Sequence, residues 1–312
     1  MNRTKRSRRS APAAWCGARS RLLIVGCGDV ARRALPALTH RLRVLALVRS
    51  AESAAALRPL GVRCVAADLD DRRSLRRIAS LARWVWHFAP PPNSGAATDP
   101  RSRALVDVLA AAGRVRRLCY ISTSGVYGDC AGAVVPETRP LAPASARGKR
   151  RVDAERAVRT LARRGVAVSI LRAPGIYGPD RLPHDRLRRG DPVLRAEDDV
   201  HTNHIDAADL ARLAWAALHR ARGGRTYNAS DDTRLKMADY FDRVADACGL
   251  PRPPRVARAE AGQRLSPMTL SFMSESRVLD NRRMKRELRL RLARPDVDAV
   301  LAAALNSPST TS

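Results

Sequence analysis

The chain has 312 residues, and its 58 Lys or Arg against 30 Asp or Glu give a formal net charge of +28. Because 45% of the residues are hydrophobic, the chain can bury a full core, which excludes global disorder and allows one large domain or two modest ones. The basic residues are almost all arginines spread along the chain, and few aromatic residues accompany them, so we expect weak retention on polyanions but no specific nucleic-acid partner.

Both ends of the chain are polar. The first twenty residues carry six positive charges and no acidic residue, and Arg8-Arg9 resembles a twin-arginine export signal. The apolar stretch that follows is too short for such a signal and contains Pro12, so we expect residues 1–20 to be a disordered basic tail and residues 307–312 to be frayed. No apolar run approaches the ~18 residues of a membrane span, and the six cysteines form no C-x-x-C pair. The sequence therefore predicts a cytoplasmic protein with reduced thiols and no membrane partner.

The segment 21–33, RLLIVGCGDVARR, carries the first functional signal. Its four consecutive apolar residues are typical of a strand buried on both faces. A Gly-x-Gly turn and helix-forming residues follow, which is the context of the dinucleotide fingerprint. The glycines allow a sharp turn and a close approach of a pyrophosphate, to which the helix start offers N–H groups. The predicted cofactor residues here are Gly26, Cys27, Gly28, Asp29 and Val30.

Two residues of this segment leave alternatives open. Cys27 is either a small loop residue or a reactive thiol at a helix N-terminus. Pro36 is a misfit inside the predicted helix, so we expect a kink or an early end there.

A second apolar run, residues 42–48, ends at Arg49-Ser50. An NAD site usually has Asp or Glu at this distance from the glycines, whereas an arginine suits the 2′-phosphate of NADP. The alternative is that Arg49 is one more surface arginine. We expect NADP to be preferred over NAD, with Arg49 and Ser50 at the adenosine end.

Further apolar runs alternate with helical patterns. We expect strands at 62–66, 83–89, 117–121 and 166–171, with helices at 75–82, 99–113 and 145–164 between them. This alternation predicts an α/β fold, a Rossmann-type doubly wound parallel sheet, over residues 21–173. Ligands of such sheets bind at the carboxyl ends of the strands, which adds Asp68, Leu69, Ala89 and Pro90 to the predicted cofactor site.

From Pro174 onward the chain is richer in Pro, Gly and Asp. Helices are predicted at 206–221, 236–248 and 279–292, and a short strand at 225–228. We expect residues 174–306 to form a smaller C-terminal substrate lobe with interleaved returns to the Rossmann core.

Residues 120–128, YISTSGVYG, resemble the short-chain dehydrogenase/reductase superfamily, in its extended and atypical branches of NAD-dependent epimerases and dehydratases. Further matches are found at Arg172, Pro174–Pro179, His204–Asp206, Tyr227-Asn228 and Met284–Leu288. The resemblance implies a nicotinamide cofactor, with Pro174 and Ile176 beside it, and a small-molecule substrate in the C-terminal lobe. It also explains His204 without a metal, and we expect no metal site. A homodimer is a further expectation.

The resemblance places the catalytic Ser/Thr at Thr123, flanked by Ser122 and Ser124, where it would polarise a substrate oxygen. The alternative is that these hydroxyls only bind N–H groups of the turn. The family's Y-x-x-x-K acid/base pair is missing: alignment on Glu155 puts Arg147 at the tyrosine position and Arg151 at the lysine position.

Arginine is a poor general acid because it stays protonated near pH 7. We therefore expect Arg147, with Arg151 on the same helix face, to grip an anionic substrate, and water, Tyr127 or the Ser/Thr cluster to move the proton. The sequence leaves two functions open. One is an NADP-dependent oxidoreductase or epimerase/dehydratase-like enzyme for a small carbonyl or sugar-like substrate. The other is a catalytically silent NADP-binding sensor or partner protein.

Overall fold

A seven-stranded parallel sheet forms the centre of the computed structural model, which describes residues 20–306. The expected basic tail, apart from Ser20, and the expected frayed end lie outside the described residues. The strand order is β11-β7-β5-β4-β1-β2-β3. The strands are β1 (Arg21–Val25), β2 (Arg43–Val48), β3 (Arg63–Ala66), β4 (Trp84–His87), β5 (Arg117–Thr123), β7 (Ala167–Ala173) and β11 (Arg225–Asn228). The doubly wound Rossmann fold predicted from the sequence is confirmed.

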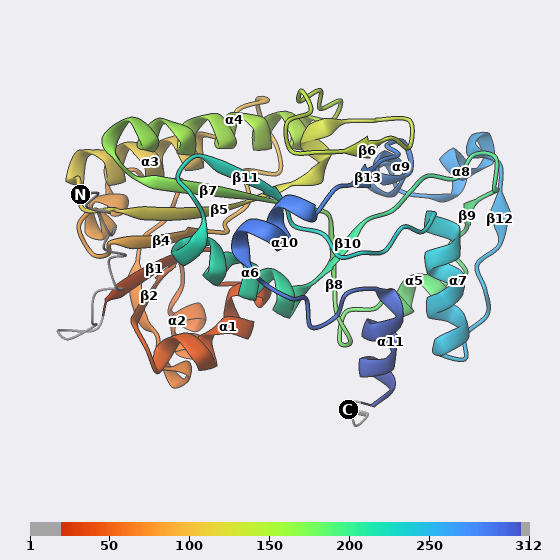
Figure 1. Cartoon of the computed structure of the whole chain (residues 1–312), viewed down its shortest axis with the longest axis horizontal. Coiled ribbons are helices and arrows are strands. Elements are labelled where there is room, and N and C mark those ends of the chain that lie inside the picture. The colour runs from red at the N-terminus through yellow and green to blue at the C-terminus, as the bar shows by residue number, and fades with distance from the viewer. Residues whose placement is uncertain (1–19, 307–312) are drawn as a thin grey trace, which may run out of the picture.

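Helices cover both faces of this sheet (Figure 1). One face carries α1 (Asp29–Thr39), α2 (Ala51–Leu57), α6 (Ala207–Arg220) and α10 (Arg282–Leu288), and the other carries α3 (Pro100–Ala112) and α4 (Ala146–Thr160). Strand β1 shows why its sequence is uniformly apolar: Leu22 and Ile24 pack into the first core, and Leu23 and Val25 into the second. The sheet and these helices are called the Rossmann layer below.

A second lobe lies beyond the carboxyl ends of the strands (Figure 1). It contains three two-stranded sheets, namely β8 (Gly175–Tyr177) with β10 (His204–Asp206), β9 (Val193–Leu194) with β12 (Arg255–Val256), and β6 (Val134–Val135) with β13 (Val278–Leu279). Its helices are α5 (His184–Arg188), α7 (Met237–Ala247), α8 (Arg258–Arg264), α9 (Pro267–Met273) and α11 (Val297–Leu305). Short 3-10 helices complete the described chain: η1 (Arg58–Leu60), η2 (Ser74–Ile78), η3 (Ser124–Tyr127) and η4 (Leu161–Arg164). No helix of residues 20–306 is both long and apolar enough to cross a membrane.

Several predicted elements differ from the structure. The early end at Pro36 is wrong, because α1 continues to Thr39. Its last turn buries Leu38, and burying a leucine is worth about 1.5–3 kcal/mol, comparable to the ~3 kcal/mol cost of a proline inside a helix. The helix predicted over 75–82 is reduced to η2, and that over 279–292 to α10. By contrast, the short strand predicted at 225–228 is present as β11, which carries Tyr227 and Asn228 and lies at the edge of the main sheet.

Candidate cofactor and active site

The glycine turn after β1 has a shape that only glycine allows. Gly26 has φ +92°, and a Cβ built on it would lie 2.4 Å from the backbone nitrogen of Ala89. That nitrogen donates to the carbonyl of Val25 at 2.9 Å, which holds the end of β4 against the turn. The predicted cofactor residue Ala89 therefore lies next to Gly26, and Pro90 follows it in the chain.

Gly28 fits the second part of the fingerprint. It is the N-cap of α1, its missing side chain leaves the helix start uncapped, and a Cβ there would have nothing within 4 Å. Open space in front of N–H groups at a helix N-terminus suits a pyrophosphate. Asp29 and Val30 begin the helix, and Ala31 is buried against the core. The open, uncapped helix start at Gly28 therefore fits a dinucleotide.

Cys27 does not have the character of a reactive thiol. Burial raises its pKa to about 11, against the lowering effect of Arg32. A thiol with such a pKa is almost wholly protonated near pH 7, so it is a poor nucleophile. The structure favours the alternative that Cys27 is a small loop residue.

The predicted adenosine end lies where β2 and β3 finish. Arg49 is exposed directly after β2, and Ser50 caps α2 by accepting a hydrogen bond from the Ser53 N–H at 3.2 Å. Asp68 is half-buried and Leu69 buried after the neighbouring β3. Because β2 and β3 are neighbours, their adjoining ends place the predicted cofactor residues Asp68 and Leu69 beside the segment that carries Arg49 and Ser50.

Thr123 ends β5 opposite Ala173 of β7, so Pro174 and the half-buried Ile176 follow at the same sheet edge. The Thr123 Oγ1 accepts a hydrogen bond from the Gly125 N–H at 3.3 Å. This is the turn-binding role that the alternative interpretation expected, but it leaves the Thr123 proton available for donation. Ser122 and Ser124 are buried, at 2% and 6% exposure, so the structure does not present them to a ligand as Thr123 is presented.

The side chain of Tyr127 is buried in the core. It is 1% exposed; its hydroxyl donates to the Asn228 Oδ1 at 2.7 Å and accepts from Arg172 at 2.8 Å. Burial raises its pKa, opposed by Arg172. The hypothesis that Tyr127 moves the substrate proton is therefore corrected: its hydroxyl is enclosed and already hydrogen-bonded.

The same network contains a buried ion pair that the sequence analysis missed. Arg172 donates to both carboxylate oxygens of Glu155, at 2.8 and 3.0 Å, and Glu155 is 0% exposed. Burial raises the pKa of Glu155, but the bonds from Arg172 outweigh it and lower that pKa overall. This pair ties α4 to β7 beneath the site and is structural.

Arg147 and Arg151 have different surroundings, although they lie one turn apart on α4. Arg151 is 9% exposed and donates to the Ile121 carbonyl at 2.7 Å and to the Tyr120 hydroxyl at 3.1 Å. Arg147 is exposed, with its guanidinium 5.6 Å from the centre of the Phe272 ring. The expected joint clamp is corrected, because Arg151 is committed to the end of β5 and only Arg147 faces outward.

Glu275 is a site residue that the sequence analysis did not find. A Cβ placed on Gly125 would lie 3.7 Å from the Thr123 Oγ1 and 3.9 Å from the Glu275 Oε2. Arg277 holds this carboxylate at 2.6 Å and also donates to the Gly128 carbonyl. The one available signal was that Glu275 is the sole acidic residue between Glu260 and Asp280.

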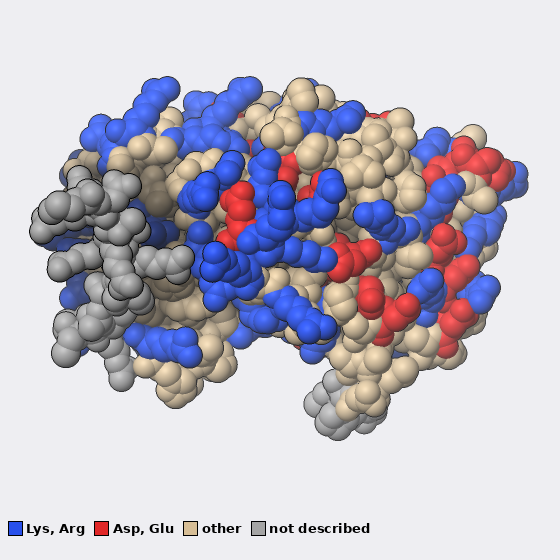
Figure 2. Space-filling model, in the orientation of Figure 1, with Lys and Arg blue, Asp and Glu red and all other residues tan. Residues whose placement is uncertain are grey.

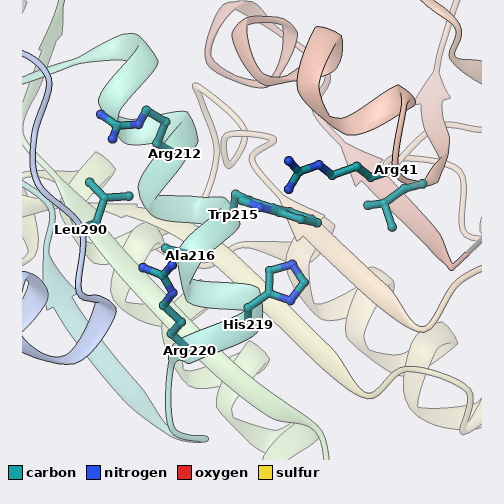
Figure 3. Close-up of a pocket in the computed structure, with 8 residues that line it drawn as sticks. Arg41, Arg212, Trp215, Ala216, His219, Arg220 and Leu290 are labelled. Atoms are coloured by element: carbon teal, nitrogen blue, oxygen red, sulfur yellow. The ribbon is translucent and has the colours of Figure 1, made fainter. Parts of the chain in front are cut away.

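Basic and acidic side chains are unevenly distributed, and one cavity lies away from this site. Figure 2 shows basic side chains gathered over the Rossmann layer and acidic ones over the second lobe. A cavity of about 590 Å³ lies along α6. Its lining includes Trp215, Arg212 and Arg220 of that helix and Arg41, which precedes β2 (Figure 3). It therefore opens at the amino ends of the strands, away from Gly26 and Thr123. Within residues 20–306, no group of three or more metal-ligating side chains comes together.

Comparisons with known proteins agree with this geometry. Residues 26–221 match the profile of a family described as NAD(P)H-binding. A ketoreductase of a farnesyl-dihydroquinoline oxide from Stigmatella aurantiaca is 26% identical over 258 residues, covering 76% of this chain and 77% of that protein. Protein YeeZ of Escherichia coli K12 is 26% identical over 209 residues, covering 66% and 70% of the two chains.

Solved structures share the whole architecture. A functionally unknown conserved protein from Silicibacter pomeroyi is 31% identical with a TM-score of 0.78, covering 92% of this chain and 98% of its own. The dTDP-glucose 4,6-dehydratase DesIV from Streptomyces venezuelae, with NAD bound, is 22% identical with a TM-score of 0.72 and coverages of 91% and 96%. The profile match spans more than half of the chain and shows that the chain belongs to the NAD(P)H-binding family, and the solved structures share its fold.

Proposed function

We propose that this protein is an NADP-dependent oxidoreductase or epimerase/dehydratase-like enzyme for a small carbonyl or sugar-like substrate that carries an anionic group. The observation that carries the proposal is the turn at Gly26 and Gly28, which is closed on one side by Ala89 and open in front of α1. The 2′-phosphate would lie at Arg49, whose exposed guanidinium suits a doubly charged group. When bound, the cofactor would accept or deliver hydride.

The chain's own residues would hold and polarise the substrate. Thr123 has a hydroxyl proton to donate to a substrate oxygen, because its oxygen accepts from the Gly125 N–H. Arg147 stands exposed on the neighbouring helix and would bind a carboxylate or phosphate of the substrate. Neither residue replaces the family tyrosine as an acid, so the proton would pass to water.

A catalytically silent NADP-binding protein is the second candidate. The enclosed hydroxyl of Tyr127 favours it, because its burial removes a group that proton transfer could use. Cofactor binding is common to both candidates; turnover separates them. In either case we propose a small-molecule ligand, no specific nucleic-acid partner and a homodimer.

The test begins with fluorescence titrations of NADPH and NADH against the full chain. Small carboxylates and sugar phosphates are then screened by thermal shift with and without NADPH, and each hit is tested for cofactor oxidation or reduction. NADPH-dependent hits with turnover support the enzyme, and hits without turnover support the silent protein. Failure of the wild-type protein to bind either dinucleotide would refute both.

A further inference from the structure

A loop of the second lobe reaches the start of α1. This loop, residues 178–182, follows β8. Its Arg181 donates to the Asp29 Oδ2 at 2.8 Å. Its Asp180 accepts from Arg33 at 2.7 and 2.9 Å, and Arg33 also contacts Asp29 at 3.0 Å. Four charges of alternating sign therefore connect the second lobe to the first two turns of the helix that the dinucleotide fingerprint opens.

The backbone of the loop is fixed while its charged side chains are accessible. Leu182 is buried in the core of the second lobe, and the Arg181 N–H donates to the Gly178 carbonyl at 2.9 Å. The side chain of Arg181 is 39% exposed. It can therefore change partner by rotating about its own bonds, without moving the loop.

Asp29 creates an electrostatic conflict for a dinucleotide. Its carboxylate stands in the first turn of α1, where the N–H groups and the helix dipole favour an anion. A pyrophosphate bound beside Gly28 would lie near this negative charge. Arg181 and Arg33 both pair with this carboxylate, and the guanidinium of Arg181 has further N–H donors beyond the nitrogen that contacts Asp29.

We propose that Arg181 is a pyrophosphate-binding residue of the cofactor site, supplied by the second lobe and paired with Asp29 in this structure. Arg33 positions its loop by holding Asp180. This inference rests on the proposed function, because it requires a bound dinucleotide. It links the lobe expected to hold the substrate directly to the cofactor, so each ligand would favour the lobe arrangement that the other uses.

The first experiment titrates NADPH by fluorescence against the wild-type full chain, Arg181→Ala and the control Arg188→Ala. Arg188 is a surface arginine of α5 whose carboxylate contact is long, at 3.6 Å. We expect Arg181→Ala to weaken NADPH binding roughly tenfold or more, as for loss of a charged hydrogen bond, and Arg188→Ala to bind like the wild type. Circular dichroism checks folding, and Arg181→Gln provides a second variant if Arg181→Ala does not fold.

A second probe identifies the part of the cofactor involved. Adenosine 2′-monophosphate carries the 2′-phosphate but no pyrophosphate. Arg181→Ala should leave its affinity unchanged, whereas Arg49→Ala should weaken both this probe and NADPH. Equal weakening of both probes by Arg181→Ala would overturn the assignment to the pyrophosphate.

Asp29→Asn separates direct contact from charge neutralisation. If Arg181 contacts the pyrophosphate, the double variant Asp29→Asn with Arg181→Ala still binds NADPH several-fold more weakly than Asp29→Asn alone. If the double variant binds as tightly as Asp29→Asn, Arg181 acts only by neutralising Asp29 and the proposal fails. Wild-type affinity in Arg181→Ala overturns this inference alone, whereas a wild-type chain that binds no NADPH overturns the proposed function as well.

Discussion

Gly26 and Gly28 lie two residues apart, but substituting them should affect different properties. Substitution of Gly26 should lower the free energy of unfolding, and substitution of Gly28 should abolish NADPH binding. Gly26→Ala places a Cβ 2.4 Å from the Ala89 nitrogen and 2.8 Å from the Phe88 carbonyl carbon, both rigid backbone atoms. The left-handed conformation at φ +92° adds its own cost. A left-handed alanine costs about 1–2 kcal/mol and overpacking about 1–3 kcal/mol, so we expect a loss of about 2–5 kcal/mol in the free energy of unfolding.

Gly28→Val tests the cofactor site without this strain. Gly28 has φ −85°, and no atom lies within 4 Å of a Cβ built there. The valine side chain would fill the space in front of α1 where a pyrophosphate should approach the backbone. Because valine is disfavoured relative to glycine at an N-cap, we expect a loss of about 1 kcal/mol in the free energy of unfolding, together with the loss of NADPH binding by a chain that stays folded.

Urea unfolding followed by circular dichroism measures the first effect, and NADPH fluorescence titration measures the second. Gly26→Ala tests the stability of the turn, and Gly28→Val tests NADPH binding by a chain that stays folded. Wild-type stability in Gly26→Ala would refute the close approach of Ala89. Wild-type NADPH affinity in Gly28→Val would refute the placement of the pyrophosphate in the space in front of α1.

Three further predictions concern charged residues. Arg49→Ala should reduce the ratio of NADPH to NADH affinity by about tenfold, as for the loss of ~1.5–3 kcal/mol of charged hydrogen bonding; an unchanged ratio in fluorescence titrations would make Arg49 a surface charge only. Arg147→Ala should weaken the binding of anionic compounds found in the thermal-shift screen far more than it weakens NADPH binding. Equal weakening of both would show that Arg147 does not bind the substrate and that this part of α4 is only structural. Glu155→Gln leaves the Arg172 charge buried and should cost about 3–5 kcal/mol in urea unfolding. Because Arg172 lowers the pKa of Glu155, the stability from this pair is present above the unfolded value of about 4.3 and is lost as the pH falls through the folded pKa. The variant should therefore show a weaker acid dependence of stability than the wild type.

The sequence determined the parts of this protein that depend on neighbouring residues. The apolar run of β1, the glycines at 26 and 28 and the alternation of strands with helices each follow from local backbone preference and periodicity. Together with the right-handed crossover rule they specify a parallel sheet and the edge at which ligands bind. The placement of Arg49 and Asp68 at adjoining strand ends follows from the same rule.

Only the tertiary structure decided which of the polar residues at this edge are accessible. Tyr127 lies in a motif that resembles an active site, but its hydroxyl donates a hydrogen bond to Asn228, about 100 positions later in the chain. Arg151 turns inward to a strand carbonyl, and Glu275 reaches Gly125 from a distant helix end. The pair of Asp29 with Arg181 spans 152 positions. Such contacts depend on how the second lobe packs on the Rossmann layer, and no local periodicity encodes that packing.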